Sequence, residues 1–140
     1  MAVLSSVSVP ALLIISIAIA AFLVYLPFGA VGAARFQLGY DQSAPRAMFD
    51  KLPPYAKRAT WAHENSFEAL TLFAPAALVA YVTGVDSSVA AIAAIVHLIA
   101  RALYSLFYVL NIPLLRSLMY AIGSLGTFTL FGLGCYAALG

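Results

Sequence analysis

Two apolar segments of this chain are too short to cross a bilayer unless each includes a charged residue. The uncharged stretch 69–83 has fewer than the roughly 20 residues that a membrane-spanning helix needs. Its helix must therefore extend back through Glu68. The stretch 87–100 likewise can span only if its helix continues through Arg101. Because charges at membrane depth are rare and costly, they usually mark a functional cavity or a pair that faces the protein interior.

The composition places the chain among proteins that cross the membrane several times. Of its 140 residues, 64% are hydrophobic and 9% are charged, whereas soluble domains carry about 25% charged residues. The net charge of +2 is too small to argue for nucleic acid. A single cysteine, Cys135, excludes an internal disulfide and fits no metal-ligand spacing. We therefore expect an all-α membrane protein with no metal site and no nucleic-acid partner.

Four membrane-spanning helices account for nearly all of the apolar residues. Pro27 is expected to kink or end the first helix, because proline removes a backbone donor and clashes with the preceding turn. A polar loop with at most a short helix follows at 35–57. Gly84 fits a helix C-terminus, and Asp86 or Ser87 fits the next N-cap. The predicted spans, all within one domain of residues 1–140, cover 7–34, 57–83, 87–110 and 114–139.

The basic residues predict how these helices are oriented. All of them lie in the first loop, the third loop or the adjoining helix ends, and the second loop has none. Because cytoplasmic loops are enriched in Lys and Arg, we expect loops one and three in the cytoplasm and both chain ends outside. The seven residues are Arg35, Arg46, Lys51, Lys57, Arg58, Arg101 and Arg116.

Polar side chains form one stripe on each of the two central spans. At 100° per residue, Arg58, Asn65 and Glu68 share one face of the second span. His63 points away from that face. Antiparallel pairing would bring Glu68 and Arg101 to the same depth. Two interpretations remain open: an ion pair that ties the helices together, or a hydrated pocket for an anionic ligand. The stripe of the third span consists of His97, Arg101, Tyr104 and Tyr108.

Other residues of the last two spans have structural interpretations. His97 extends the polar stripe deeper into the membrane, and we interpret it as a hydrogen-bonded structural histidine. Four glycines of the last span are predicted to let helix backbones approach closely, as small residues do in membranes. They are Gly123, Gly126, Gly132 and Gly134.

Two sequence blocks resemble the MAPEG family, the membrane-associated proteins in eicosanoid and glutathione metabolism. The first block is the run 57–68, KRATWAHENSFE, which contains the pattern R-A-x-x-A-H-x-N-x-x-E. The second is the run 101–108, RALYSLFY, followed by Arg116 and Ser117 at the start of the fourth span. The resemblance implies a four-helix bundle assembled as a homotrimer, with glutathione bound between subunits near the cytoplasmic leaflet. It also implies an integral protein of the bacterial inner membrane.

The resemblance assigns roles to individual residues. It implies that Arg116 stabilises the glutathione thiolate, with Ser117 beside it. His63 would contribute from the adjacent subunit. The remaining residues would line the glutathione pocket from the second and third spans: Arg58, Asn65, Glu68, Arg101, Tyr104 and Tyr108.

The implied activity is attack of glutathione thiolate on a lipophilic electrophile or hydroperoxide that arrives from the membrane lipids. The chain departs from the pattern of the catalytic family members at Trp61, where these relatives commonly carry a second arginine. An alternative is therefore a lipid-binding or fatty-acid-binding protein without catalysis, which the family also contains. A third hypothesis is a small multidrug exporter that uses Glu64 or Glu68. The essential acid of such exporters lies in the first span, which is uncharged here.

Overall fold

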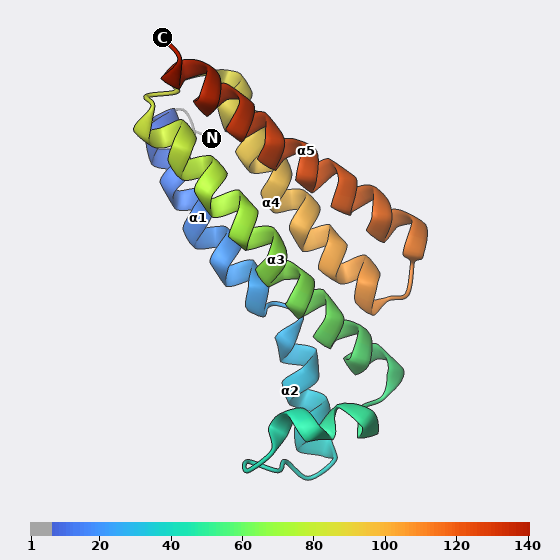
Figure 1. Ribbon diagram of the computed structural model, residues 1–140. Coiled ribbons are helices and arrows are strands. Elements are labelled where there is room, and N and C mark those ends of the chain that lie inside the picture. The colour runs from blue at the N-terminus through green and yellow to red at the C-terminus, as the bar shows by residue number, and fades with distance from the viewer. Residues whose placement is uncertain (1–6) are drawn as a thin grey trace.

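The computed structural model describes residues 7–140, and every regular element in that part of the chain is helical (Figure 1). Four long helical segments run along one another as a bundle, and the shorter elements extend from one end of it. The elements are α1 (Val9–Tyr25), α2 (Phe28–Gln37), η2 (Pro45–Lys51), α3 (Pro54–Val82), α4 (Ser88–Val109) and α5 (Pro113–Ala138), where η2 is a 3-10 helix.

The four predicted spans are confirmed as helical segments that are long and apolar enough to cross a membrane, the first of them made of α1 and α2. They comprise Val9–Gln37, Pro54–Val82, Ser88–Val109 and Pro113–Ala138. The chain is therefore an integral, multi-pass membrane protein. Two predicted bounds differ from the structure. The first segment ends at Gln37, three residues after its predicted end at 34. α3 begins at Pro54 and not at 57, because proline suits the first turn of a helix.

Pro27 ends the first helix rather than kinking it. Because proline has no backbone N–H, α1 stops at Tyr25 and α2 starts at Phe28 on a different axis (Figure 1). His63 of α3 binds at this break, where its Nδ1 lies 2.6 Å from the carbonyl oxygen of Val24. A carbonyl only accepts hydrogen bonds, so Nδ1 carries the proton and satisfies an end group of α1.

The connections between the later helices have the predicted chemistry. Gly84 has a φ of +73°, which glycine adopts without steric cost. Ser87 is the N-cap of α4, and its side chain accepts a hydrogen bond from the backbone N–H of Ala90. α3 and α4 therefore form the predicted antiparallel hairpin.

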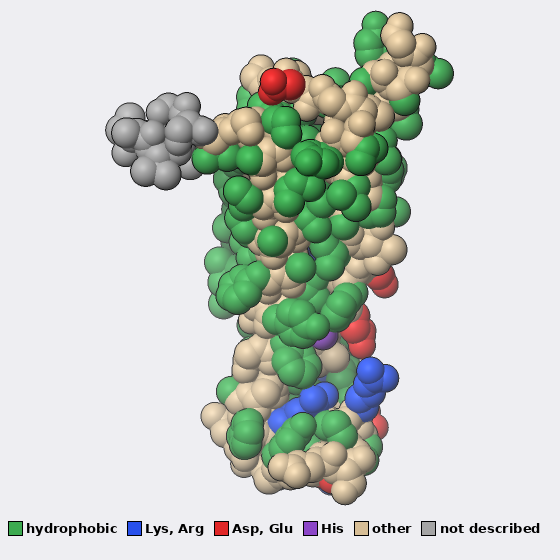
Figure 2. Space-filling model, turned by 90° about the vertical axis from the view of Figure 1, so that its left-hand side faces the viewer, with side chains coloured by type: hydrophobic (Ala, Val, Ile, Leu, Met, Phe, Trp, Pro, Cys, Tyr) green, Lys and Arg blue, Asp and Glu red, His purple; other side chains and the backbone are tan. Residues whose placement is uncertain are grey.

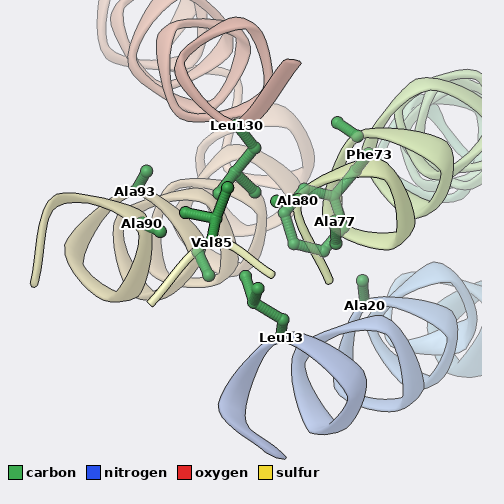
Figure 3. Packing of buried hydrophobic residues seen from close by; sticks show 11 residues of the cluster. Leu13, Ala20, Phe73, Ala77, Ala80, Val85, Ala90, Ala93 and Leu130 are labelled. Atoms are coloured by element: carbon green, nitrogen blue, oxygen red, sulfur yellow. The ribbon is translucent and has the colours of Figure 1, made fainter. Parts of the chain in front are cut away.

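The larger of two apolar clusters in residues 7–140 lies at the end of the bundle opposite α2 and η2, and a smaller one packs α2 against the start of α3. Figure 3 shows Leu13, Phe73 and Leu130 converging from α1, α3 and α5. Most of the surrounding core residues are alanines of α3 and α4, whose small side chains let the helix backbones approach closely. The charged side chains of the two stripes lie outside this core, whereas the His97 ring stacks on its Phe73.

Three of the four glycines in α5 pack as predicted. A Cβ added to Gly126 would lie 2.7 Å from the carbonyl oxygen of Ala93, and one added to Gly134 would lie 2.6 Å from Val79 Cγ1. Gly123 is also in contact with α4. The prediction was wrong for Gly132, because an added Cβ there would meet nothing within 4 Å.

The surface divides into an apolar body and a charged end. Figure 2 shows hydrophobic side chains over most of one face, with the Lys and Arg side chains of that face at its lower end. Many large side chains on the body are exposed, including Phe22, Ile92 and Leu125. Such a band suits contact with lipid.

Candidate functional site

A polar cavity opens between α3, α4 and α5 at the charged end of the bundle. Its volume is about 310 Å³. We call it the outer cavity, and it is lined by Asn65, Tyr104, Tyr108, Arg116, Ser117 and Tyr120. The fold therefore gathers five of the predicted site residues from three helices.

Aromatic rings hold the cation of the outer cavity in place. The guanidinium carbon of Arg116 lies 4.6 Å from the centre of the Tyr108 ring. Tyr108 in turn packs edge-on against Tyr104, with 5.6 Å between ring centres. A guanidinium on a ring face keeps its in-plane N–H groups free for an anion. The arrangement can therefore present a positioned positive charge to a ligand.

A second cavity of about 190 Å³ lies deeper along the same groove. This inner cavity shares Asn65 and Tyr120 with the outer cavity. Its polar side is formed by Glu68, Arg101 and His97 together with hydroxyl groups of α5, and its apolar side includes Leu72 and Phe128. Apart from Arg58, the two predicted polar stripes therefore line two cavities that share Asn65 and Tyr120.

The direct ion pair considered from the sequence is not formed in residues 7–140. Arg101 Nη2 donates to Asn65 Oδ1 at 3.0 Å and to Ser66 Oγ at 3.2 Å. Asn65 Nδ2 donates to Glu68 Oε2 at 3.0 Å. The amide stands between the two charges because Arg101 is only 5% exposed, whereas Glu68 lies on the outer surface of α3.

The contacts of His97 agree with its structural interpretation. Its ring is 2% exposed and lies parallel to the Phe73 ring, with centres 3.8 Å apart. Nδ1 is 3.0 Å from the carbonyl oxygen of Gly123 and 3.1 Å from Thr127 Oγ1. These contacts join α3, α4 and α5 at the floor of the inner cavity.

Arg58 lies apart from the other predicted site residues. Its Nε and Nη2 donate to the carbonyl oxygen of Val109, at 3.1 and 3.0 Å. This bond satisfies an end group of α4 and ties that helix to α3. Arg58 lines a separate cavity of about 500 Å³, the interfacial cavity, with Leu52, Pro54, Lys57, Trp61 and Asn111. Its contact with glutathione stays a prediction.

His63 faces the opposite side of α3, as its helical position predicted. It lines a cavity of about 620 Å³, the lateral cavity, together with Arg35, Arg46 and Glu64. Arg35 is only 9% exposed, and its Nε has no hydrogen-bond partner in the described part of the chain. Its guanidinium lies over the Phe28 ring at 5.7 Å. A buried donor without a partner is costly, so this cavity suits an anionic group.

Sequence reasoning missed Tyr120 and Arg35. Tyr120 follows Arg116 by four residues and therefore lies on the same face of α5, so helical spacing was a usable signal. It forms the boundary between the outer and inner cavities. From the sequence, Arg35 is only one of the basic residues that orient the helices in the membrane. Its burial depends on how α2 packs against α3, which no local pattern reveals.

A comparison with protein families gives an independent result. The model described as MAPEG family matches residues 12–136, nearly the whole chain. No curated protein and no solved structure matches it. The matched region contains every residue that lines the outer and inner cavities. The chain therefore belongs to the MAPEG family.

Proposed function

We propose that this protein is a membrane glutathione transferase or peroxidase that acts on lipophilic substrates. Family membership supports a function in glutathione or eicosanoid chemistry. The observation that carries the finer proposal is the outer cavity, where Arg116 and Ser117 lie beside Tyr104, Tyr108 and Asn65. This is a set of donors around one fixed cation, which suits a bound thiolate.

Arg116 would act electrostatically. A free thiol has a pKa of about 8.5, and a neighbouring guanidinium favours the thiolate, which is the nucleophile. Arginine stays protonated and cannot serve as a base. The Ser117 hydroxyl can donate a hydrogen bond to the same sulfur. The proton of the thiol would leave to water through the open side of the cavity.

Two reactions are available to the thiolate. Attack on an electrophilic carbon forms a carbon–sulfur bond and yields a conjugate. Either a leaving group departs with the electron pair of its bond to that carbon, or the π bond of an activated alkene breaks and the resulting carbanion takes up a proton. Attack on a hydroperoxide breaks the oxygen–oxygen bond, and the alkoxide takes up a proton to leave as an alcohol. The glutathione sulfenic acid then condenses with a second glutathione to give the disulfide and water.

The inner cavity offers groups for the ends of the glutathione molecule. A guanidinium such as Arg101 is the natural partner of a carboxylate, and the carboxylate of Glu68 is the natural partner of the α-amino group. Leu72 and Phe128, both exposed at the rim, would face an apolar second substrate that arrives from the lipid.

The assembly we propose is a homotrimer with glutathione between neighbouring subunits. Glu68 lies at the middle of α3 and is exposed on the single chain, as is Glu64. A carboxylate at that depth is costly against acyl chains, so a second copy is expected to cover it. The lateral cavity, where Arg35 and Arg46 outnumber Glu64, is a suitable cationic surface for the facing subunit.

The proposed location is the bacterial inner membrane, with the site at the cytoplasmic leaflet. It rests on the positive residues of the first loop and of the helix ends beside the first and third loops, of which Arg116 lines the outer cavity.

Glutathione binding to the detergent-purified protein tests the proposal. Calorimetry should detect binding, and ultraviolet absorbance should show that the bound thiol is ionised. Arg116→Ala should lose most of the thiolate signal, whereas Lys51→Gln removes an exposed charge of η2 and should leave it unchanged. Wild-type protein that ignores glutathione but retains a fatty acid through purification would favour the lipid-binding alternative instead.

A further inference from the structure

We propose that the interfacial cavity binds the phosphate group of an anionic membrane lipid. The cavity lies where η2 leads into α3 and where α4 ends, and its volume is about 500 Å³. Two of its lining side chains, Lys57 and Arg58, are cationic, Asn111 adds an amide, and none of the lining residues is acidic. An uncompensated pair of cations at the mouth of a cavity attracts an anion.

Arg58 is fixed in a position from which it can bind such a ligand. Its bonds from Nε and Nη2 to the carbonyl oxygen of Val109 hold the guanidinium plane. A guanidinium has five N–H donors, so the Nη1 group stays available. Lys57 Nζ lies 5.5 Å from the centre of the Phe49 ring, a contact that leaves the N–H donors pointing away from the ring available to an anion. Both cations are therefore positioned without using up their capacity for an anion.

The cavity lies at the level expected for lipid headgroups. Trp61, which is 43% exposed, forms part of its wall, and tryptophan is enriched at membrane interfaces. The bond from Arg58 to Val109 places the cavity beside the last turn of a spanning helix. Leu52 and Pro54 supply apolar surface next to the cations. A phosphate joined to a glycerol backbone matches this combination better than a free ion does.

Arg58 is the one residue of this site that the family resemblance also assigns to the glutathione pocket, and the other lining residues have no role in the proposed glutathione chemistry. The interfacial and outer cavities have no lining residue in common. They are neighbours through the rings of Trp61 and Tyr108, whose centres are 6.5 Å apart. Loss of lipid binding at the interfacial cavity is therefore not expected to abolish glutathione binding at the outer cavity.

The test uses Trp61, the single tryptophan of the chain, as a fluorescent reporter in the full-length purified protein. Mixed micelles containing phosphatidylglycerol should change its emission at lower lipid concentration than micelles containing phosphatidylcholine. Lys57→Gln should weaken phosphatidylglycerol binding about five-fold, the effect of one basic residue at a membrane surface. Circular dichroism checks that the variant folds.

Lys51→Gln is the matched control, because Lys51 lies on η2 and does not line the cavity. The proposal is overturned if both variants lose binding equally, or if the wild type does not distinguish the two lipids. Inorganic phosphate is the other probe. If it changes the Trp61 emission and displaces phosphatidylglycerol, the site is one for soluble phosphate and the lipid assignment is wrong. Glutathione binding should be unchanged in Lys57→Gln.

Discussion

At the residue scale, the polar centre depends on Asn65. Its amide accepts from buried Arg101 and donates to exposed Glu68, so one neutral side chain links two charges that do not touch. Asparagine is suited to this position because it has both a donor and an acceptor. Asn65 also lines both the outer and the inner cavities.

Asn65→Leu should therefore destabilise the fold. The change leaves Arg101 with Ser66 as its remaining partner, and a buried donor that loses its acceptor costs about 1–3 kcal/mol. Thermal unfolding followed by circular dichroism in detergent measures the loss. Thr129→Val is a fair control, since it removes only an exposed bond to its own helix.

The Asn65 amide should also transmit the energetic coupling between Glu68 and Arg101. In a double-mutant cycle, Glu68→Gln and Arg101→Leu should be non-additive in the wild-type background. The coupling should vanish in the Asn65→Leu background. Coupling of the same size in both backgrounds would contradict transmission through Asn65.

At the element scale, α5 packs on α4 through backbone surfaces and not through large side chains. Gly126 lies directly against the carbonyl of Ala93 and the backbone of His97. The same approach positions His97 for its bond to Gly123. The floor of the inner cavity and the helix packing therefore depend on the same glycines.

Gly126→Ala should destabilise the bundle by about 1–3 kcal/mol, because a Cβ at 2.7 Å from a carbonyl oxygen forces backbone movement. Gly132→Ala is the matched control within the same helix. It meets nothing within 4 Å and should gain up to about 1 kcal/mol from helix propensity. Chemical unfolding of the two variants compares them. Equal effects at both positions would refute the role assigned to close packing.

At the scale of the whole molecule, the single chain has cavities on two opposite sides of α3. The outer and inner cavities hold Arg116 and Glu68, and the lateral cavity holds His63 and Arg35. The proposed trimer would bring these two sides together between subunits. Each glutathione site would then take the residues around Arg116 from one subunit and those around His63 from its neighbour.

Coexpression of two defective variants tests this arrangement. Arg116→Ala and His63→Ala should each lower glutathione turnover alone. Mixed trimers should recover about a quarter of wild-type turnover, the share of sites that receive both intact halves under random assortment. Coexpression of Arg116→Ala with Tyr108→Ala is the control. Both changes affect the half of the site that comes from one subunit, so this mixture should show no recovery of turnover. Equal turnover in both mixtures would argue for sites within one subunit.

Much of the fold could be predicted because it depends on local chemistry. Hydropathy located four spans, Pro27 located the break and Gly84 with Ser87 located the hairpin. Helical spacing also placed His63 on a different face from Asn65. Individual contacts could not be predicted, since they depend on how each helix is rotated against its neighbours. The end-group bonds of Arg58 and His63 are examples.

The sequence by itself determined the membrane-spanning architecture and which side chains share a helical face, because backbone sterics and the apolar solvent act on each segment separately. Only the tertiary structure decided that Arg101 meets Asn65 and not Glu68, and that Arg58 binds the end of α4. It also decided that Arg35 is buried with an Nε that has no hydrogen-bond partner within residues 7–140. These outcomes depend on distances of a few ångströms between helices far apart in sequence, which are set by the close packing of glycine and alanine.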